Sequence, residues 1–203
     1  QLLKKLHELK IDDNTLVILT SDNGPVVDDG YQDRAEELLN GHSPAGPFRG
    51  NKYSAFEGGT AVPFIVSWPR KIKGGAVSKA LVSQIDLLSS LGSLVHARLP
   101  KGSAPDSRNY LPTILGSDQK GRDYVIGQSN THVLSVLTPQ YRYIEPSNGP
   151  KMIQWGPKIE TGNLPVPQLY DMTVSPYETN NVAAEHPDEV SRMQDILKNE
   201  RSK

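Results

Sequence analysis

The stretch that decides the fold is LVILTSDNG, residues 16–24, in which an apolar run ends in an acid, an amide and a glycine. The four apolar residues at 16–19 predict a strand covered on both faces, as is typical of a central parallel strand. Asp22 and Asn23 follow this strand, at the edge of an open α/β sheet where ligands bind. A carboxylate beside an amide oxygen suits a hard cation, but Asp-Asn-Gly-Pro is also a strong turn signal. Taken alone, these residues favour the turn over the metal site.

The sequence on either side predicts further helices and strands. Apolar residues are spaced for one helical face in residues 1–10 and again after Asp86, which can cap the second helix. A second apolar run, entered through Pro63 and stopped by Pro69, predicts another buried strand. Between the two strands lies a long polar excursion rich in glycine, proline and aspartate, of the kind that forms functional loops. Apolar residues that share one face predict a short helix within it, around residues 33–39.

The composition and the spacing of apolar residues change after about residue 121. Short β-prone runs then predict an antiparallel meander, and Pro187 opens a final amphipathic helix. A doubly buried strand near the start needs parallel neighbours and crossovers, so the sequence is expected to begin within a domain. The predicted fold class is α/β: the rear part of a parallel sheet with helices over residues 1–118, then a small antiparallel sheet and a closing helix over residues 119–203.

Composition excludes several classes of protein. The formal net charge of the 203-residue chain is -1 and its hydrophobic content is 36%. Nothing is basic enough for a nucleic-acid surface, and no apolar segment approaches the length of a bilayer span, so neither a nucleic-acid nor a membrane partner is expected. The absence of cysteine excludes disulfides and thiolate metal sites but leaves the cellular compartment open.

Longer stretches carry a resemblance to a known family. After Asp22-Asn23-Gly24-Pro25 come GPFRGNKYSAFEGGTAVPFIVSWP at residues 46–69, LVSQIDLL from Leu81, and QLYDMTVSPYETNNVA at residues 168–183. In this order they resemble the carboxy-terminal half of the sulfatases of the alkaline phosphatase superfamily, in particular the arylsulfatase-like enzymes of bacteria that degrade sulfated glycans. The resemblance implies an alkaline-phosphatase-like sheet, hydrolysis of a sulfate ester on a carbohydrate or aryl group, and a periplasmic or extracellular location.

The resemblance also assigns roles to the residues at the end of the first strand. It implies that Asp22 and Asn23 hold calcium, with magnesium as the other candidate, because both metals are hard cations. These two side chains can supply only part of a calcium shell, which needs about six to eight oxygens. Asp28 and Asp29 do not match the spacing of an EF-hand loop and are expected to be solvated loop charges.

Lys52 is the candidate ligand of the sulfate group. Gly50 and Asn51 precede it, and both tolerate a positive φ that lets backbone approach a ligand. An ammonium is a compact point charge that suits a small anion, although an ordinary loop lysine is the simpler interpretation when the family is set aside. The sulfatases bind sulfate with a lysine in this register. Many of them carry glycine where this chain has Asn51.

Three further features near Lys52 have more than one possible role. Arg49 can contact the same anion or brace the loop by pairing with Glu57, and bracing is the favoured role. His42 can donate to a sugar hydroxyl, protonate a leaving oxygen, or simply lie on the surface. Residues 57–60 place a carboxylate before a strand, but the resemblance implies an architectural role in which the glycines permit close packing.

The nucleophile of the family is not found in this chain. The resemblance implies a formylglycine made from Cys or Ser in a Cys/Ser-x-Pro-x-Arg motif, which the sequence lacks. The chain alone is therefore expected to be inactive and to need a missing amino-terminal half or to self-associate. Two alternatives stay open at this point: a phosphoryl hydrolase of the same superfamily, and a non-catalytic fragment or module.

Overall fold

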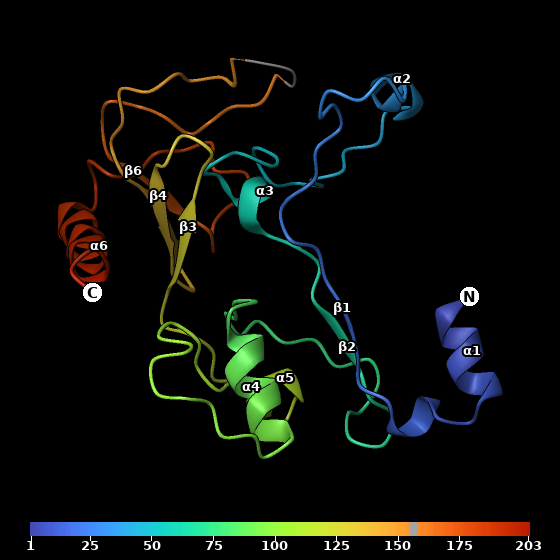
Figure 1. Cartoon of the computed structure of the whole chain (residues 1–203). Coiled ribbons are helices and arrows are strands. Elements are labelled where there is room, and N and C mark those ends of the chain that lie inside the picture. Colours follow the sequence, from blue (N-terminus) through green and yellow to red (C-terminus); the bar gives the residue numbers. More distant parts are fainter. Residues whose placement is uncertain (155–157) are drawn as a thin grey trace. The chain divides into compact units, whose positions relative to one another are not determined.

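The computed structural model describes residues 1–154 and 158–203 (Figure 1), and these form two compact units. The first unit comprises Gln1–Thr20 and Pro63–Asp123, and the second comprises Ser21–Val62 and Tyr124–Lys203. The long excursion between the two apolar runs thus belongs with the carboxy-terminal part of the chain. The sequence-based division at 118/119 stays a prediction, and each unit is described by itself.

The first unit contains two short strands that pair with each other. Strand β1 (Val17–Leu19) runs antiparallel to β2 (Ile65–Ser67), with Val17 opposite Ser67. The expectation of buried strands in a parallel arrangement is wrong for this pair, and Leu19 is 55% exposed. An apolar run indicates a strand but fixes neither the direction of its neighbour nor what covers it. Here the excursion returns the chain in the opposite direction.

Two helices of the first unit, α1 (Leu2–Glu8) and α4 (Asp86–Leu94), lie where apolar spacing predicts them, and two further short helical elements accompany them. These are the 3₁₀ turn η1 (Asp12–Asn14) and α5 (Leu111–Ile114). Asp86 is the first residue of α4 and not its cap, because Ile85 holds the cap position. Its buried carboxylate instead accepts hydrogen bonds from Arg122 at 2.5 and 2.7 Å and from the Arg108 backbone N–H at 2.9 Å. Burial opposes ionisation of this carboxyl, but the Arg122 guanidinium keeps its pKa below the ordinary value.

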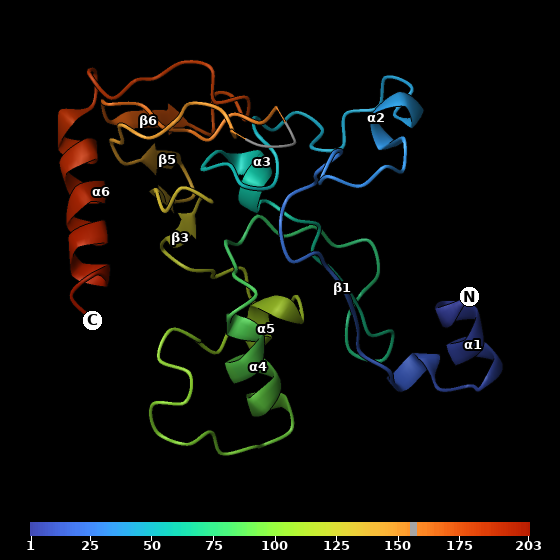
Figure 2. The same ribbon diagram turned by 45° about the horizontal axis from the view of Figure 1, so that its top comes forward.

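The second unit contains the predicted antiparallel meander and the closing helix. Its four strands lie side by side in chain order: β3 (Val125–Gln128), β4 (Leu134–Leu137), β5 (Tyr141–Ile144) and β6 (Gln168–Asp171). Helix α6 (Pro187–Glu200) lies beside this sheet in both views (Figure 1, Figure 2). These features confirm the predicted α/β class with a small antiparallel sheet and a carboxy-terminal helix.

The core of the second unit joins that helix to the sheet. Met193 and Leu197 of α6 pack with Val136, Tyr143 and Leu169 from the strands. Burial of such side chains stabilises the unit by about 1.5–3 kcal/mol each, before cavity effects are considered. Residues 55–56 of the excursion pack against the same sheet in a second apolar cluster.

Two short helices interrupt the excursion. Helix α2 (Ala35–Leu38) lies where apolar spacing around residues 33–39 predicts it, whereas α3 (Glu57–Thr60) is not evident in the sequence pattern. Among all the helices of the described residues, none is long and apolar enough to cross a membrane.

Candidate active site

Two segments of the second unit meet at the predicted site. The Gly24 N–H donates to the Gly59 carbonyl at 3.0 Å, and the Lys52 N–H donates to the Pro25 carbonyl at 2.8 Å. These two backbone hydrogen bonds bring the turn with Asp22 and Asn23 beside the loop that carries Lys52. Two predicted elements of the site, separated by about 30 residues of excursion, are thereby neighbours.

Glycines make this close approach possible. A Cβ on Gly24 would lie 1.8 Å from the Gly58 carbonyl oxygen, and a Cβ on Gly58 would lie 2.3 Å from the Gly50 carbonyl oxygen. Real Cβ atoms do not approach backbone this closely, so a side chain at Gly24 would push the two segments apart, and one at Gly58 would distort the loop that carries Lys52. The predicted architectural role of the glycines in residues 57–60 agrees with this packing.

Asp22 and Asn23 present oxygen atoms that a cation could use. Asp22 is exposed, and the Asn23 amide nitrogen donates to the Gly24 carbonyl at 2.9 Å, which leaves the amide oxygen available. Within the described part of the chain, no hydrogen bond to the Asp22 carboxylate or to this amide oxygen is found, and no group of three or more His, Asp and Glu residues is placed to hold a metal. The donors present therefore fit a hard cation as two ligands of a larger shell.

Lys52 is held by a carboxylate that the sequence did not single out as a partner. Its ammonium nitrogen lies 2.9 Å from Asp29 Oδ2, and the Tyr53 hydroxyl donates to Asp29 Oδ1. The hydrogen bonds from Tyr53 and from Lys52 hold the pKa of Asp29 below its ordinary value, and Asp29 in turn raises the pKa of Lys52. The expectation that Asp29 is a solvated loop charge is wrong, because its side chain is ion-paired and only 25% exposed.

Arg49 braces the loop, but its partner is not Glu57. Its guanidinium makes two hydrogen bonds to Glu160, at 2.7 and 3.1 Å, and a third to the Glu178 carbonyl at 2.8 Å. It also lies 4.0 Å from the centre of the Phe56 ring. A bidentate pair of this kind is geometrically specific, and it holds the pKa of Glu160 below the ordinary value. Contact between Arg49 and a substrate anion stays a prediction.

Glu57 belongs to a buried network beneath the loop. Arg142 of β5 pairs with Glu57 and lies 3.3 Å from Glu178, whose second oxygen accepts the Glu57 backbone N–H at 2.8 Å. Arg142 also donates to the Ala55 carbonyl at 3.3 Å. We call Glu57, Arg142 and Glu178 the buried network. It connects the sheet directly to the start of α3.

Glu178 has an unusual protonation equilibrium. Burial raises its pKa to about 7, although the Arg142 charge and the hydrogen bond from Glu57 act in the opposite direction. Glu178 Oε1 and Arg142 Nε are buried, and neither has a well-formed hydrogen bond to any described residue, even though they are only 3.3 Å apart. The incomplete pairing is consistent with a carboxyl that takes up a proton near neutral pH.

His42 is not brought to Lys52 by any described contact. Its side chain is exposed, and its backbone N–H donates to the Leu39 carbonyl at 2.8 Å just after α2. Within the described residues, no hydrogen bond joins its ring to Asp22, Asn23 or Lys52. A role for His42 toward substrate stays a prediction.

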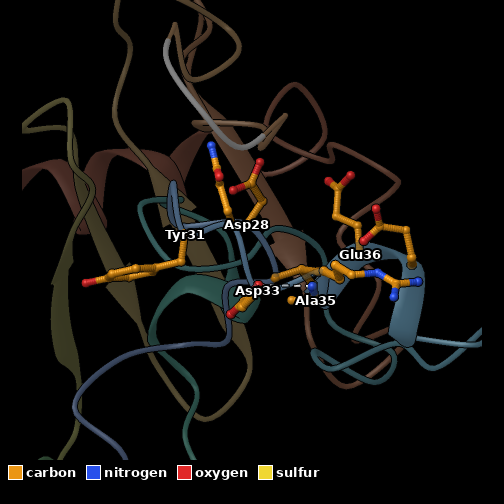
Figure 3. A pocket seen from close by; sticks show the side chains of 9 residues that line it. Asp28, Tyr31, Asp33, Ala35 and Glu36 are labelled. Carbon is orange, nitrogen blue, oxygen red and sulfur yellow. Dashed lines mark hydrogen bonds between the residues drawn. The ribbon is translucent and has the colours of Figure 1, made fainter.

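A cavity of about 300 Å³ lies in the excursion, next in sequence to Asp29. Figure 3 shows Asp28 and Asp33 on the segment before α2 and Glu36 on the helix itself. Tyr31 is 76% exposed at its edge, and Asp33 accepts the Ala35 N–H at 3.0 Å. Four carboxylates and one guanidinium line the cavity, which gives it an acidic character: Asp28, Asp33, Arg34, Glu36 and Glu37.

Comparisons with known proteins agree with this geometry. A sulfatase family model matches residues 1–97. The chain is 48% identical over 197 residues to an N-acetylgalactosamine-6-O-sulfatase of Bacteroides thetaiotaomicron, which covers 97% of this chain and 38% of that protein. It is 32% identical over 142 residues to the N-acetylgalactosamine-6-sulfatase of Canis lupus familiaris, which covers 70% of this chain and 26% of that protein.

A solved structure extends the likeness to the fold. A sulfatase structure from a glycosaminoglycan-metabolism locus of Bacteroides thetaiotaomicron matches with a TM-score of 0.94 at 47% identity, covering 100% of this chain and 42% of that one. The chain thus spans less than half the length of the relatives it matches. Sequence identity and backbone similarity extend along nearly all of it, and the chain belongs to the sulfatase family of the alkaline phosphatase superfamily.

Proposed function

We propose that the complete protein containing this chain hydrolyses sulfate esters of carbohydrates. The observation that carries the proposal is the meeting of Lys52 with the Asp22–Pro25 turn through two backbone hydrogen bonds. It brings a cation suited to a sulfate group and two oxygen donors suited to a metal into one place. The matching relatives are named as sulfatases, which does not favour the phosphoryl-hydrolase alternative.

Each residue would act on the sulfate group in a different way. The Lys52 ammonium would donate to the sulfuryl oxygens, where preorganised donors stabilise developing charge. Asp22 and Asn23 would hold calcium, or magnesium, which supplies positive charge to the same oxygens when bound. A formylglycine nucleophile would come from outside this chain, so we expect the chain alone to be inactive and to need the rest of a sulfatase.

The acidic cavity supports a carbohydrate as the remainder of the substrate. Exposed Tyr31 offers an apolar face to a sugar ring, and the surrounding carboxylates can accept hydrogen bonds from hydroxyl groups. Two relatives are named for N-acetylgalactosamine 6-sulfate, so a sulfated amino sugar is the substrate we propose first. Like the sulfatases of bacteria that degrade sulfated glycans, the enzyme would work in the periplasm or outside the cell.

The test uses the complete protein with N-acetylgalactosamine 6-sulfate and the corresponding phosphate ester. We expect release of sulfate and little release of phosphate. Asp22→Ala should lower both bound metal and turnover, because it removes a charged ligand. The control Asp195→Ala, at an exposed position of α6, should change neither. Release of phosphate without sulfate would contradict the proposal, and so would an Asp22→Ala protein with undiminished metal and rate.

A further inference from the structure

Two consecutive side chains converge on one carboxylate at the site. The Lys52 ammonium donates a hydrogen bond to Asp29 Oδ2 at 2.9 Å, and the Tyr53 hydroxyl donates one to Asp29 Oδ1. The ammonium also lies 5.1 Å from the centre of the Tyr53 ring. Both oxygens of Asp29 are therefore engaged, each by a different neighbour in the chain.

The backbone at Tyr53 explains how two consecutive residues reach the same group. In extended chain, successive side chains point to opposite sides. Tyr53 has a φ of 82°, in the left-handed region that residues other than glycine rarely adopt, and Asn130 donates to its carbonyl at 3.0 Å. Strained backbone of this kind tends to occur where a site requires a particular arrangement of side chains.

We propose that Asp29 is a positioning residue for Lys52 and that Tyr53 holds Asp29 in place. The inference rests on the proposed role of Lys52 toward the sulfate group. A lysine has a flexible stem and three donors, and a partner that fixes one donor leaves two directed elsewhere. Fixing the ammonium before substrate arrives removes an entropic cost that would otherwise fall on the reaction.

The negative charge of Asp29 explains why it has Tyr53 as a second partner beside Lys52. A bare carboxylate beside a sulfate would repel it, but Lys52 offsets the charge of Asp29 and the Tyr53 hydroxyl satisfies its other oxygen. Both interactions favour the ionised carboxylate, in agreement with the lowered pKa of Asp29. Asp29 can thus orient the Lys52 ammonium while repelling the bound sulfate only weakly.

The test is a double-mutant cycle in the complete protein with an aryl sulfate, whose turnover does not depend on sugar contacts. Asp29→Asn should lower kcat/KM about tenfold and Tyr53→Phe about threefold, with melting temperatures close to wild type. In the Lys52→Ala background, neither change should lower kcat/KM further, because a positioning residue acts only through its target. Asp195→Asn makes the same charge change on α6 and should have no effect.

Three results would overturn the inference while leaving the proposed function intact. Asp29→Asn could keep wild-type kcat/KM, or it could cost the same factor with and without Lys52, as a residue that only tethers the loop would. A matching loss in Asp195→Asn would also overturn it, because net charge and not position would then be the cause. Failure of the proposed function has a different signature, since Lys52→Ala alone would then keep full turnover.

Discussion

Arg142 and Lys52 are both cations held by carboxylates of the same compact unit, yet their surroundings differ. The Arg142 side chain is 2% exposed and pairs with Glu57 and Glu178. The Lys52 side chain is 27% exposed, and Asp29 is its one ion-pair partner among the described residues. Arg142 gives further hydrogen bonds to the Ala55 carbonyl and the Ser135 hydroxyl. The neighbours of the buried cation engage it on several sides, whereas we propose that the partly exposed cation also binds an anion from solution. The difference separates charges that hold the loop from charges that can act on a substrate.

The largest effect is expected from Arg142→Met. It would remove the guanidinium that the Glu57 carboxylate and the Glu178 carboxyl share in the buried network, and breaking a buried pair in this way costs about 3–5 kcal/mol. Chemical denaturation should show this loss in the free energy of unfolding. Arg192→Met is the matched control, because Arg192 pairs with Glu189 on the surface of α6 and should cost less than about 1 kcal/mol. Equal losses in the two variants would remove the distinction between buried and exposed cations.

The pH dependence of stability should reveal the raised pKa of Glu178. Its pKa is about 7 in the folded protein against 4.5 for the ordinary carboxyl, so between these values the folded state binds the proton that the unfolded state has lost. Stability relative to Glu178→Gln should therefore fall as pH rises from 4.5 to 7, by about 3 kcal/mol, and stay constant outside this window. Unfolding of both proteins at pH 5 and pH 8 measures the difference. A difference that does not change with pH would mean that Glu178 is ionised throughout.

Gly24→Ala should destabilise the meeting of the two site segments. The added Cβ would fall 1.8 Å from the Gly58 carbonyl oxygen, and overpacking of this kind costs about 1–3 kcal/mol. Amide hydrogen exchange of Gly24 and Lys52 should become faster, because their hydrogen bonds cross the contact. Gly74→Ala is the control, since a Cβ there meets nothing within 4 Å. Unchanged protection of both amides in Gly24→Ala would show that the segments tolerate separation.

The smallest effect is expected at the edge of the acidic cavity. Tyr31→Ala should raise KM for a sulfated sugar about threefold to tenfold, which corresponds to the loss of one aromatic contact, and should change KM for an aryl sulfate less. Tyr177→Ala removes another exposed tyrosine, outside the cavity, and should leave both values unchanged. A uniform effect of Tyr31→Ala on both substrates would argue against a sugar at this cavity.

Local patterns predicted the elements whose partners lie nearby in sequence. The antiparallel meander, α6 with its buried Met193 and Leu197, and α2 all follow from apolar period and turn residues. The meeting of the Asp22–Pro25 turn with the Lys52 loop was expected only from the family resemblance, because no periodicity connects segments so far apart. Glycines at both segments were the available physical signal.

Sequence patterns could not predict hydrogen-bond partners that lie far apart in the chain. Arg49 bonds to Glu160, 111 positions away, and Arg142 bonds to Glu57, 85 positions away. Proximity in sequence instead suggested Glu57 for Arg49, which was wrong. Strand direction was missed for a similar reason, since an apolar run carries no information on the direction of the strand beside it.

The most direct test of the account measures sulfate release and thermal unfolding on the same preparation of the complete protein with Lys52→Ala. Loss of one donor aimed at developing charge should lower turnover about a hundredfold or more. The melting temperature should stay at the wild-type value, because the loop is held by Arg49, the glycine contacts and the buried network, none of which includes the Lys52 side chain. Wild-type turnover in Lys52→Ala, or a loss of turnover that merely follows a loss of folding, would contradict the assignment of Lys52 to the sulfate group.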